Sequence, residues 1–338
     1  MNREQATLPP DTPQSSSVRV VLFDAEGEDR MIAPESLDPA RLAKHELAWI
    51  DLCADEANGV YEALAPFGLE ALPIAPLFDP RHAPVLSQQD WFGVRALAPV
   101  WNKRVECHAA PWLLLVGPNI VVTVRREAIA FLDEVAALED PDSRIGKLGA
   151  DSFATALLDR LLTAYFEAID AFEDRLDHLE VEILKPRVRT AHLPELRRLR
   201  HIVALLRRML SSHRDLFDAI ARPDFQPDQD PKVEAQFQAV SARYERAMDA
   251  VENARDLVIG SYELLSTRLS QRTNDSMRLL TFVTVMLGSL AVVAGVLGMN
   301  FQAALFKTGS TGFWVTVGAM TGFALLAMIV ARLRGWWR

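Results

Sequence analysis

The chain has 338 residues, half of them hydrophobic and 24% charged, and its formal net charge is −9. This length allows one or two soluble domains beside a membrane segment. The acidic balance, without a long basic run, argues against nucleic acid as a partner. Two cysteines, Cys53 and Cys107, lie far apart without metal-ligand spacing. We expect buried, reduced thiols, although a disulfide between them stays open.

The first half of the chain predicts a tail followed by a mixed domain. Residues 1–16 are polar and rich in proline and serine, without the apolar core of a secretory signal, so they predict a disordered tail. Residues 17–150 predict a cytoplasmic α/β domain with one short helix at Asn58–Phe67. Its expected strands are Val18–Phe23, Leu47–Leu52, Phe92–Leu97, Trp112–Val116 and Ile120–Val124.

Residues 151–278 predict a bundle of long helices that ends in a stalk. Asp151–Lys185 and Pro194–Ala221 are expected helices, and Pro223–Pro231 is an expected turn. No proline follows Pro231 before Leu297, which predicts one helix of roughly 100 Å. Apolar and small residues alternate at steps of four and three along its soluble half, as in supercoiled helices. Packing against the preceding helices of the same chain explains this repeat, and so does a bundle of several subunits.

Two apolar stretches close the chain. Leu279–Leu297 and Phe313–Ala331 are 19 residues each and carry no Asp, Glu, Lys, Arg or His. Each is long enough to cross a hydrocarbon core of roughly 30 Å as a helix. They predict a transmembrane hairpin over residues 279–331, followed by a basic tail over residues 332–338. Arginines flank the hairpin while its loop carries only Lys307, which predicts a multi-pass protein of the cytoplasmic (inner) membrane with both termini in the cytoplasm.

The first apolar stretch carries small and hydroxyl residues at helical spacing. They form one stripe: Asn274, Met277, Thr284, Gly288, Ala291 and Gly295. A contact between membrane helices explains such a stripe. A water-filled pore explains it equally, and its uncharged wall would suit an ion that keeps its hydration shell, such as Mg²⁺. No nucleotide-binding, esterase or zinc-protease motif occurs in the sequence, so we expect neither an enzyme nor a covalently bound cofactor.

Gly298-Met299-Asn300 stands directly after the first apolar stretch, at the end of the very long helix. In this position the sequence resembles the CorA family of divalent-cation channels, within the two-span superfamily that shares a Gly-x-Asn signature. Trp49–Leu52 and Pro118–Val124 extend the resemblance. It implies an α+β fold with a cytoplasmic α/β funnel domain, a long helical stalk and two C-terminal transmembrane helices. It further implies a homopentamer in membrane lipids, with five first spans around a central pore.

The resemblance also implies roles for particular residues. Gly298, Met299 and Asn300 would form the selectivity filter, with Asn300 as its outer ring. The implied cargo is Mg²⁺, with Co²⁺ or Ni²⁺, and Glu263 falls where a carboxylate would bind a regulatory Mg²⁺ between subunits. The pore-lining positions would be Asn274, Met277, Leu280, Thr284, Gly288, Ala291 and Gly295.

Several positions depart from the family pattern and keep alternatives open. Ser289 replaces a proline, Leu297 replaces an aromatic residue, and the loop Gln302–Lys307 lacks the usual acidic segment. The expected partner of Glu263 is missing, which puts metal-gated closure in doubt. A Zn²⁺ transporter of the ZntB type, which also lacks the acidic loop, is one alternative. A two-span sensor or scaffold that transports nothing is the other.

Overall fold

The computed structural model describes residues 17–54, 56–69, 72, 74–88, 90–101, 107–137, 149–185, 192–226, 230–299 and 309–334. The chain divides into two compact units. One holds Met1–His178 and Leu193–Val258, and the other holds Leu179–His192 and Ile259–Arg338. The predicted tail, residues 1–16, lies outside the described residues.

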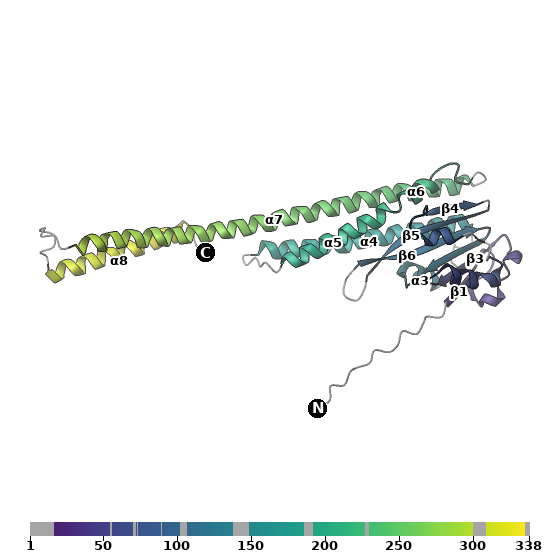
Figure 1. Cartoon of the computed structure of the whole chain (residues 1–338), viewed down its shortest axis with the longest axis horizontal. Helices are drawn as coiled ribbons and strands as arrows, with labels where there is room; N and C mark the ends of the chain where they lie inside the picture. The colour runs from purple at the N-terminus through teal and green to yellow at the C-terminus, as the bar shows by residue number, and fades with distance from the viewer. Residues whose placement is uncertain are drawn as a thin grey trace, which may run out of the picture. The chain divides into compact units, whose positions relative to one another are not determined.

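The first unit contains a seven-stranded mixed sheet (Figure 1). The order across the sheet is β2-β1-β3-β7-β6-β5-β4, in which β3 and β7 are parallel and all other neighbours are antiparallel. The strands are β1 (Ser17–Asp24), β2 (Arg30–Ile32), β3 (Glu46–Cys53), β4 (Val85–Gln88), β5 (Trp91–Trp101), β6 (Cys107–Gly117) and β7 (Ile120–Arg125). All five predicted strands are confirmed, and the short edge strands β2 and β4 are additions.

Alternating side chains give the sheet two buried faces. On one face Ile50, Leu113 and Val122 join a core that is covered by residues of short helices. These helices are α1 (Ala57–Leu64), η3 (Ala65–Phe67) and α2 (Ala75–Phe78), near the turns η1 (Pro34–Ser36) and η2 (Pro39–Arg41). On the other face the Trp49 ring meets Phe153 edge-on at 5.7 Å, which places α4 there. The helix α3 (Ala130–Ala136) packs on the same face.

The long helices follow the sequence prediction, with one correction. They are α4 (Ala150–Leu184), α5 (His192–Ser211), α6 (Arg214–Ile220), α7 (Pro231–Leu297) and α8 (Gly309–Leu333). The single helix predicted over Pro194–Ala221 is wrong, because the helix breaks between α5 and α6. At the break Ser212 Oγ donates to the Met209 carbonyl at 2.6 Å, and His213 Nε2 accepts the Leu97 N–H of β5 at 2.8 Å. The backbone also tightens there, because the His213 N–H donates to the Leu210 carbonyl at 2.9 Å, three residues earlier instead of four.

The predicted repeat in the soluble half of α7 is buried inside a single chain. Phe237, Tyr244 and Val251 are fully covered. Tyr244 Oη donates to the Leu210 carbonyl of α5 at 3.2 Å, and Arg243 pairs with Asp159 of α4. Packing against earlier helices of the same chain is therefore confirmed as one cause of the repeat. Both cysteines are free thiols and half-buried, so the expected burial is only partly met.

Candidate functional site

Two helices in the described part of the chain are long and apolar enough to cross a membrane. One is α7, through its C-terminal stretch, and the other is α8. In the most apolar 18-residue window of each helix no residue is fully buried within the chain. Large apolar side chains such as Leu280, Val292 and Trp314 are more than 60% exposed. An exposed apolar surface of this kind matches lipid rather than water, as expected for the predicted hairpin.

Each of these helices has one partly covered face. In the apolar stretch of α7, residues 279–297, the half-buried side chains are Phe282, Val283, Met286, Leu290 and Leu297. In α8 they are Gly312, Thr316, Met320, Ala324 and Ala327, and Ala331 is buried. Both sets recur at three- and four-residue steps, so each marks one side of a helix. Figure 1 draws α8 beside this part of α7, and the small residues of α8 allow such a close approach.

The predicted pore-lining residues lie on the opposite side of α7. All seven are exposed: Asn274, Met277, Leu280, Thr284, Gly288, Ala291 and Gly295. With about 100° between successive residues, their stripe is roughly half a turn from the face that α8 covers. Contact with α8 therefore does not explain the stripe.

The glycines of the stripe show the same separation from α8. A Cβ built on Gly288 or Gly295 would meet no atom within 4 Å. Within the described part of the chain, no contact therefore requires a small residue at these positions. Thr284 Oγ1 donates to the Leu280 carbonyl at 2.8 Å, so its hydroxyl is already satisfied in the helix. Contacts with other copies of the chain, or a water-filled path between them, would explain why these residues are small.

The Gly-Met-Asn motif, the predicted selectivity filter, begins where α7 ends. Gly298 N–H donates to the Ala294 carbonyl at 2.9 Å, and Met299 N–H donates to the Val296 carbonyl at 3.3 Å. A Cβ on Gly298 would lie 3.3 Å from the Ala294 oxygen, which is tight and favours glycine. Asn300 and Lys307 lie outside the described residues, so their predicted roles stay predictions.

Glu263, the predicted regulatory ligand, is an exposed residue of α7. Among the residues that the structure describes, no group of three or more His, Cys, Asp and Glu side chains could hold a metal ion. Nearby on the buried side of α7, Ser261 Oγ donates to the Glu180 carboxylate of α4. Glu263 thus remains a single carboxylate in the isolated chain, and its regulatory role stays a prediction.

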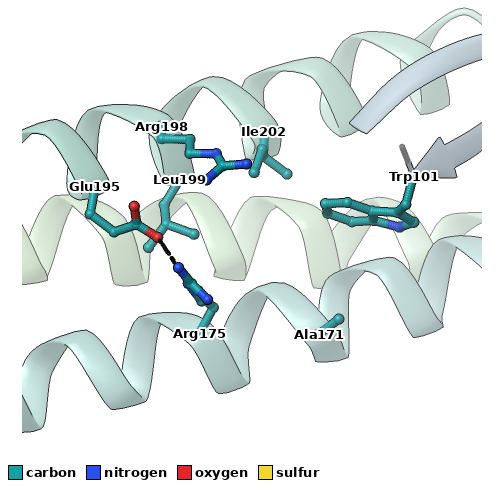
Figure 2. Close-up of a pocket in the computed structure, with 7 residues that line it drawn as sticks. All are labelled: Trp101, Ala171, Arg175, Glu195, Arg198, Leu199 and Ile202. Carbon is teal, nitrogen blue, oxygen red and sulfur yellow. Dashed lines mark hydrogen bonds and ion pairs between the residues drawn. The ribbon is translucent and has the colours of Figure 1, made fainter. Parts of the chain in front are cut away.

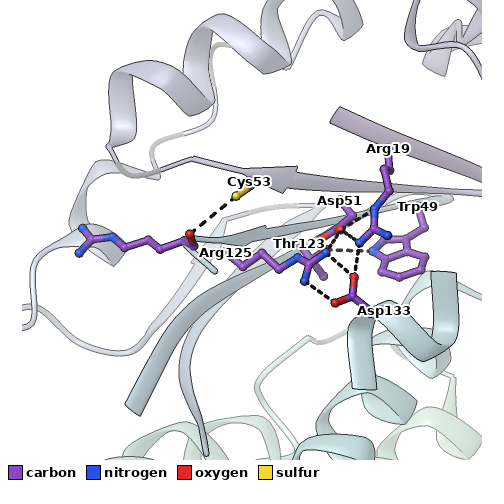
Figure 3. Close-up of polar contacts among 8 residues, drawn as sticks. Arg19, Trp49, Asp51, Cys53, Thr123, Arg125 and Asp133 are labelled. Carbon is purple, nitrogen blue, oxygen red and sulfur yellow. Dashed lines mark hydrogen bonds and ion pairs between the residues drawn. The ribbon is translucent and has the colours of Figure 1, made fainter. Parts of the chain in front are cut away.

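A network of four charged groups on the sheet was not predicted (Figure 3). Asp51 accepts hydrogen bonds from Arg19 Nη2 at 2.6 Å and from Arg125 Nη2 at 3.0 Å. Both arginines also reach Asp133 of α3, at 2.8 and 2.7 Å. The Thr123 hydroxyl donates to Asp51 at 2.8 Å. Every carboxylate is balanced by an arginine, so the network joins α3 to the sheet and leaves no free ligand for a cation.

A cavity of about 230 Å³ lies between α4 and α5, beside the end of β5 (Figure 2). Trp101, Ala171, Leu199 and Ile202 contribute to its apolar wall. Arg175 and Glu195 form an ion pair of 2.8 Å at its rim. Among the described residues that line it, Glu195 is the one carboxylate, so the cavity lacks the ligand set of a cation site.

A mixed sheet and two helices with exposed apolar stretches, one of them the 67-residue α7, together define a two-span membrane protein with a large soluble domain. The chain belongs to the family of CorA-like Mg²⁺ transporter proteins, whose model matches residues 44–332. The resemblance seen in the sequence is thereby confirmed.

Individual relatives are distant. The cobalt/magnesium transport protein CorA of Thermotoga maritima is 26% identical over 192 residues, covering 57% of this chain and 54% of that protein. The chain thus spans about half the length of that relative. CorA of Methanocaldococcus jannaschii is 19% identical over 92% of this chain and 98% of its own length. The divalent cation transporter CmaX of Pseudomonas aeruginosa is 26% identical over 59% of this chain and 60% of its own length.

Solved structures agree on the fold. The complete CorA magnesium transporter of M. jannaschii superposes with a TM-score of 0.71 at 18% identity, covering 94% of this chain and 98% of that one. Full-length CmaX superposes with a TM-score of 0.67 at 22% identity, covering 97% of this chain and 100% of that one. The ZntB cytoplasmic domain of Vibrio parahaemolyticus superposes with a TM-score of 0.55 at 10% identity, covering 75% of this chain and 98% of that one. The predicted fold class, with its mixed-sheet domain, long stalk and two apolar helices, is confirmed.

Proposed function

We propose that this chain moves divalent cations across the cytoplasmic membrane, with Mg²⁺ as its main cargo and Co²⁺ or Ni²⁺ as further cargo. The observation that carries the proposal is the uncharged stripe on α7, which is exposed on the side away from α8 and ends at the filter motif. Membership of a family of Mg²⁺ transporter-like proteins supports it. Relatives described as cobalt/magnesium and divalent cation transporters support it further.

The chemistry of the stripe fits a hydrated cation. Mg²⁺ gives up its water shell reluctantly, so hydroxyl and carbonyl oxygens can contact it through that water without a carboxylate cage. Thr284 supplies a hydroxyl, and Asn274 and Asn300 supply amide oxygens. An uncharged wall binds the ion weakly enough to release it, which conduction requires. We assign ion selection to a ring of Asn300 side chains at the outer mouth.

A single stripe cannot enclose a path, so the proposal requires several copies around one axis. The open space at Gly288 and Gly295 suits such an assembly, because small residues let neighbouring copies of α7 come close. Five copies follow from the family resemblance. Glu263 alone does not gate the pore, because the sequence lacks the second carboxylate that would complete a regulatory metal site between subunits.

The membrane potential supplies the driving force for uptake. Each charge that moves through 100 mV gains about 2.3 kcal/mol, so a divalent ion gains about 4.6 kcal/mol. This energy supports a concentration ratio of more than about a thousandfold, since about 1.4 kcal/mol corresponds to tenfold. No coupled enzyme is needed for uptake.

Zn²⁺ transport of the ZntB type is the second candidate. The observation in its favour is the loop between the two apolar helices, which has no acidic residue, as in the ZntB type. Proteoliposomes loaded with Mg²⁺- or Zn²⁺-sensitive dyes separate the two. Mg²⁺ entry driven by potential alone supports the first proposal. Zn²⁺ entry that needs a pH gradient supports the second, and no flux of either ion would indicate a sensor or scaffold.

A further inference from the structure

A second cavity, of about 350 Å³, lies on the sheet within the first unit. Its floor comes from every second residue of three neighbouring strands: Leu97 of β5, Pro111 and Leu113 of β6, and Val124 of β7. Leu77 and Phe78 of α2 and Pro80 add apolar side walls. The size and the apolar floor are typical of a site for a small organic molecule.

The charge in the cavity wall is positive. Arg95, Arg125 and Arg126 line it, and no carboxylate does so among the described residues. Arg125 is already paired with Asp51 and Asp133. The available positive charge therefore comes from Arg95 on the sheet and from Arg126, an exposed residue that follows β7.

Arg95 is fixed in place by neutral oxygens. Its Nη1 donates to the carbonyls of Leu77 at 3.2 Å and Asp79 at 2.6 Å, and its Nη2 donates to the His82 carbonyl at 3.0 Å. The neighbouring Asp79 carboxylate is held by Arg81, whose hydrogen bonds lower the pKa of Asp79 to about 2. Arg95 is thus a half-buried cation without a directly bound carboxylate in the described structure. The Asp79 carboxylate acts on Arg95 only through the longer-range electrostatic interaction, and an anion in the cavity would add a direct counter-charge.

His213 adds a hydrogen-bond donor to this wall. Its Nε2 accepts the Leu97 N–H, so the proton of the neutral ring is on Nδ1. His213 is 1% exposed, and Nδ1 has no partner among the described residues. A buried donor without a partner is unfavourable by about 1–3 kcal/mol. A ligand oxygen or a bound water would relieve this penalty.

We propose that this cavity binds a small organic anion, one with a carboxylate or phosphate head and an apolar body. The head lies toward Arg95 and Arg126, and the body lies on the floor of Leu97, Leu113 and Val124. The positive wall excludes divalent cations, so this site is distinct from the transport path. The cavity beside Trp101 makes a weaker candidate, because its Arg175 is already paired with Glu195.

Isothermal titration calorimetry of the full chain in lipid nanodiscs tests the proposal, with empty nanodiscs as the blank. The probes are 2-naphthoate, 2-naphthyl phosphate and neutral 2-naphthamide, which share one apolar body. We expect one or both anions to bind at least tenfold more tightly than the amide, with affinity that falls as salt rises. The preferred anion then identifies the head group as carboxylate or phosphate.

Three variants locate the binding. Ser212→Trp places a bulky ring at an exposed residue of the cavity rim and should abolish binding. Arg126→Gln removes one charge and should weaken anion binding about three- to tenfold. Arg41→Gln, an equal charge change at a side chain 86% exposed and outside the cavity lining, should leave binding unchanged. Equal affinity for the amide, no saturable anion binding, or binding that survives Ser212→Trp would each overturn the proposal.

Discussion

Asp51 and Arg125 face each other across the parallel pair β3 and β7, with 3.0 Å between Oδ2 and Nη2 and with both side chains more than 90% buried. A buried pair of this kind is weak evidence for net stability, because desolvation of both charges offsets their attraction. Removal of one partner is different, since it leaves an uncompensated charge in the core. Here the pair also fixes α3, because Arg125 reaches Asp133 as well.

Arg125→Met should therefore destabilise the soluble domain by about 3–5 kcal/mol, because Asp51 would stay buried with only Arg19 beside it. Chemical denaturation followed by tryptophan fluorescence measures the change, since Trp49 and Trp112 lie next to the network. Arg81→Met is the matched control. It breaks a 2.7 Å pair with Asp79 in which the arginine is 88% exposed, and it should cost less than about 1 kcal/mol. Equal losses in the two variants would refute the structural role of the network.

His213 makes the domain sensitive to mild acid. Burial lowers the pKa of His213 from 6.5 to about 3, so the folded chain keeps the ring neutral while the unfolded chain takes up a proton below about pH 6.5. The unfolded state then binds more protons, and stability falls as the pH drops from 6.5 toward 3. The slope approaches about 1.4 kcal/mol per pH unit within this window. Thermal unfolding at pH 7.5 and pH 5 should show a smaller loss in His213→Gln, whose amide can accept the Leu97 N–H without titrating. If His213→Gln loses as much thermal stability between pH 7.5 and pH 5 as the native protein, groups other than His213 cause the acid sensitivity.

The stripe on α7 should tolerate no large side chain. A Cβ at Gly288 meets no atom of the described residues within 4 Å, so we expect a loss of flux in Gly288→Leu to arise between copies or in the water-filled path. We expect more than a tenfold loss of Mg²⁺ flux without loss of expression. Gly322→Leu in α8 makes the same change at another open glycine and should have little effect. Equal flux through both variants would mean that the stripe does not line the path.

Lys307 should slow the entry of divalent cations from outside. Lys307→Glu replaces a repelling charge with an attracting one, so Mg²⁺ uptake at low salt should rise several-fold. The gain should shrink toward 150 mM salt, where the screening length is about 8 Å. Lys44→Glu, a change at an exposed residue of the soluble domain, is the control and should leave uptake unchanged. A gain that is independent of salt would contradict an electrostatic cause.

The sequence predicted long elements well because their patterns extend over many turns. The bounds of α7 match Pro231 and Leu297, since Pro231 is the last proline of the sequence and the Gly-Met-Asn motif follows Leu297. The edge strands β2 and β4 were missed because they have only three and four residues, too few for a periodic signal. The break between α5 and α6 was missed because Ser212 and His213 are not helix breakers by themselves. The break depends on a contact between His213 and β5, far away in the sequence.

The stripe on α7 could also be found from the sequence, because helical spacing alone puts its residues on one side. That it lies away from α8 could not be predicted, since this depends on which face of α7 the second helix covers. The charged network could not be predicted from the sequence for a related reason. Asp51, Arg125 and Asp133 come from three elements, and only the topology of the sheet brings them together.

The most direct test of the proposed function is Mg²⁺ flux into proteoliposomes under an inside-negative potential, with native protein and Asn300→Ala compared side by side. We predict potential-driven Mg²⁺ entry through the native protein. Selective entry should be lost in Asn300→Ala, while the variant still assembles into the same oligomer by size-exclusion light scattering. Unchanged selective flux through Asn300→Ala would contradict the asparagine ring, and no Mg²⁺ flux through the native protein would contradict the proposed transport itself.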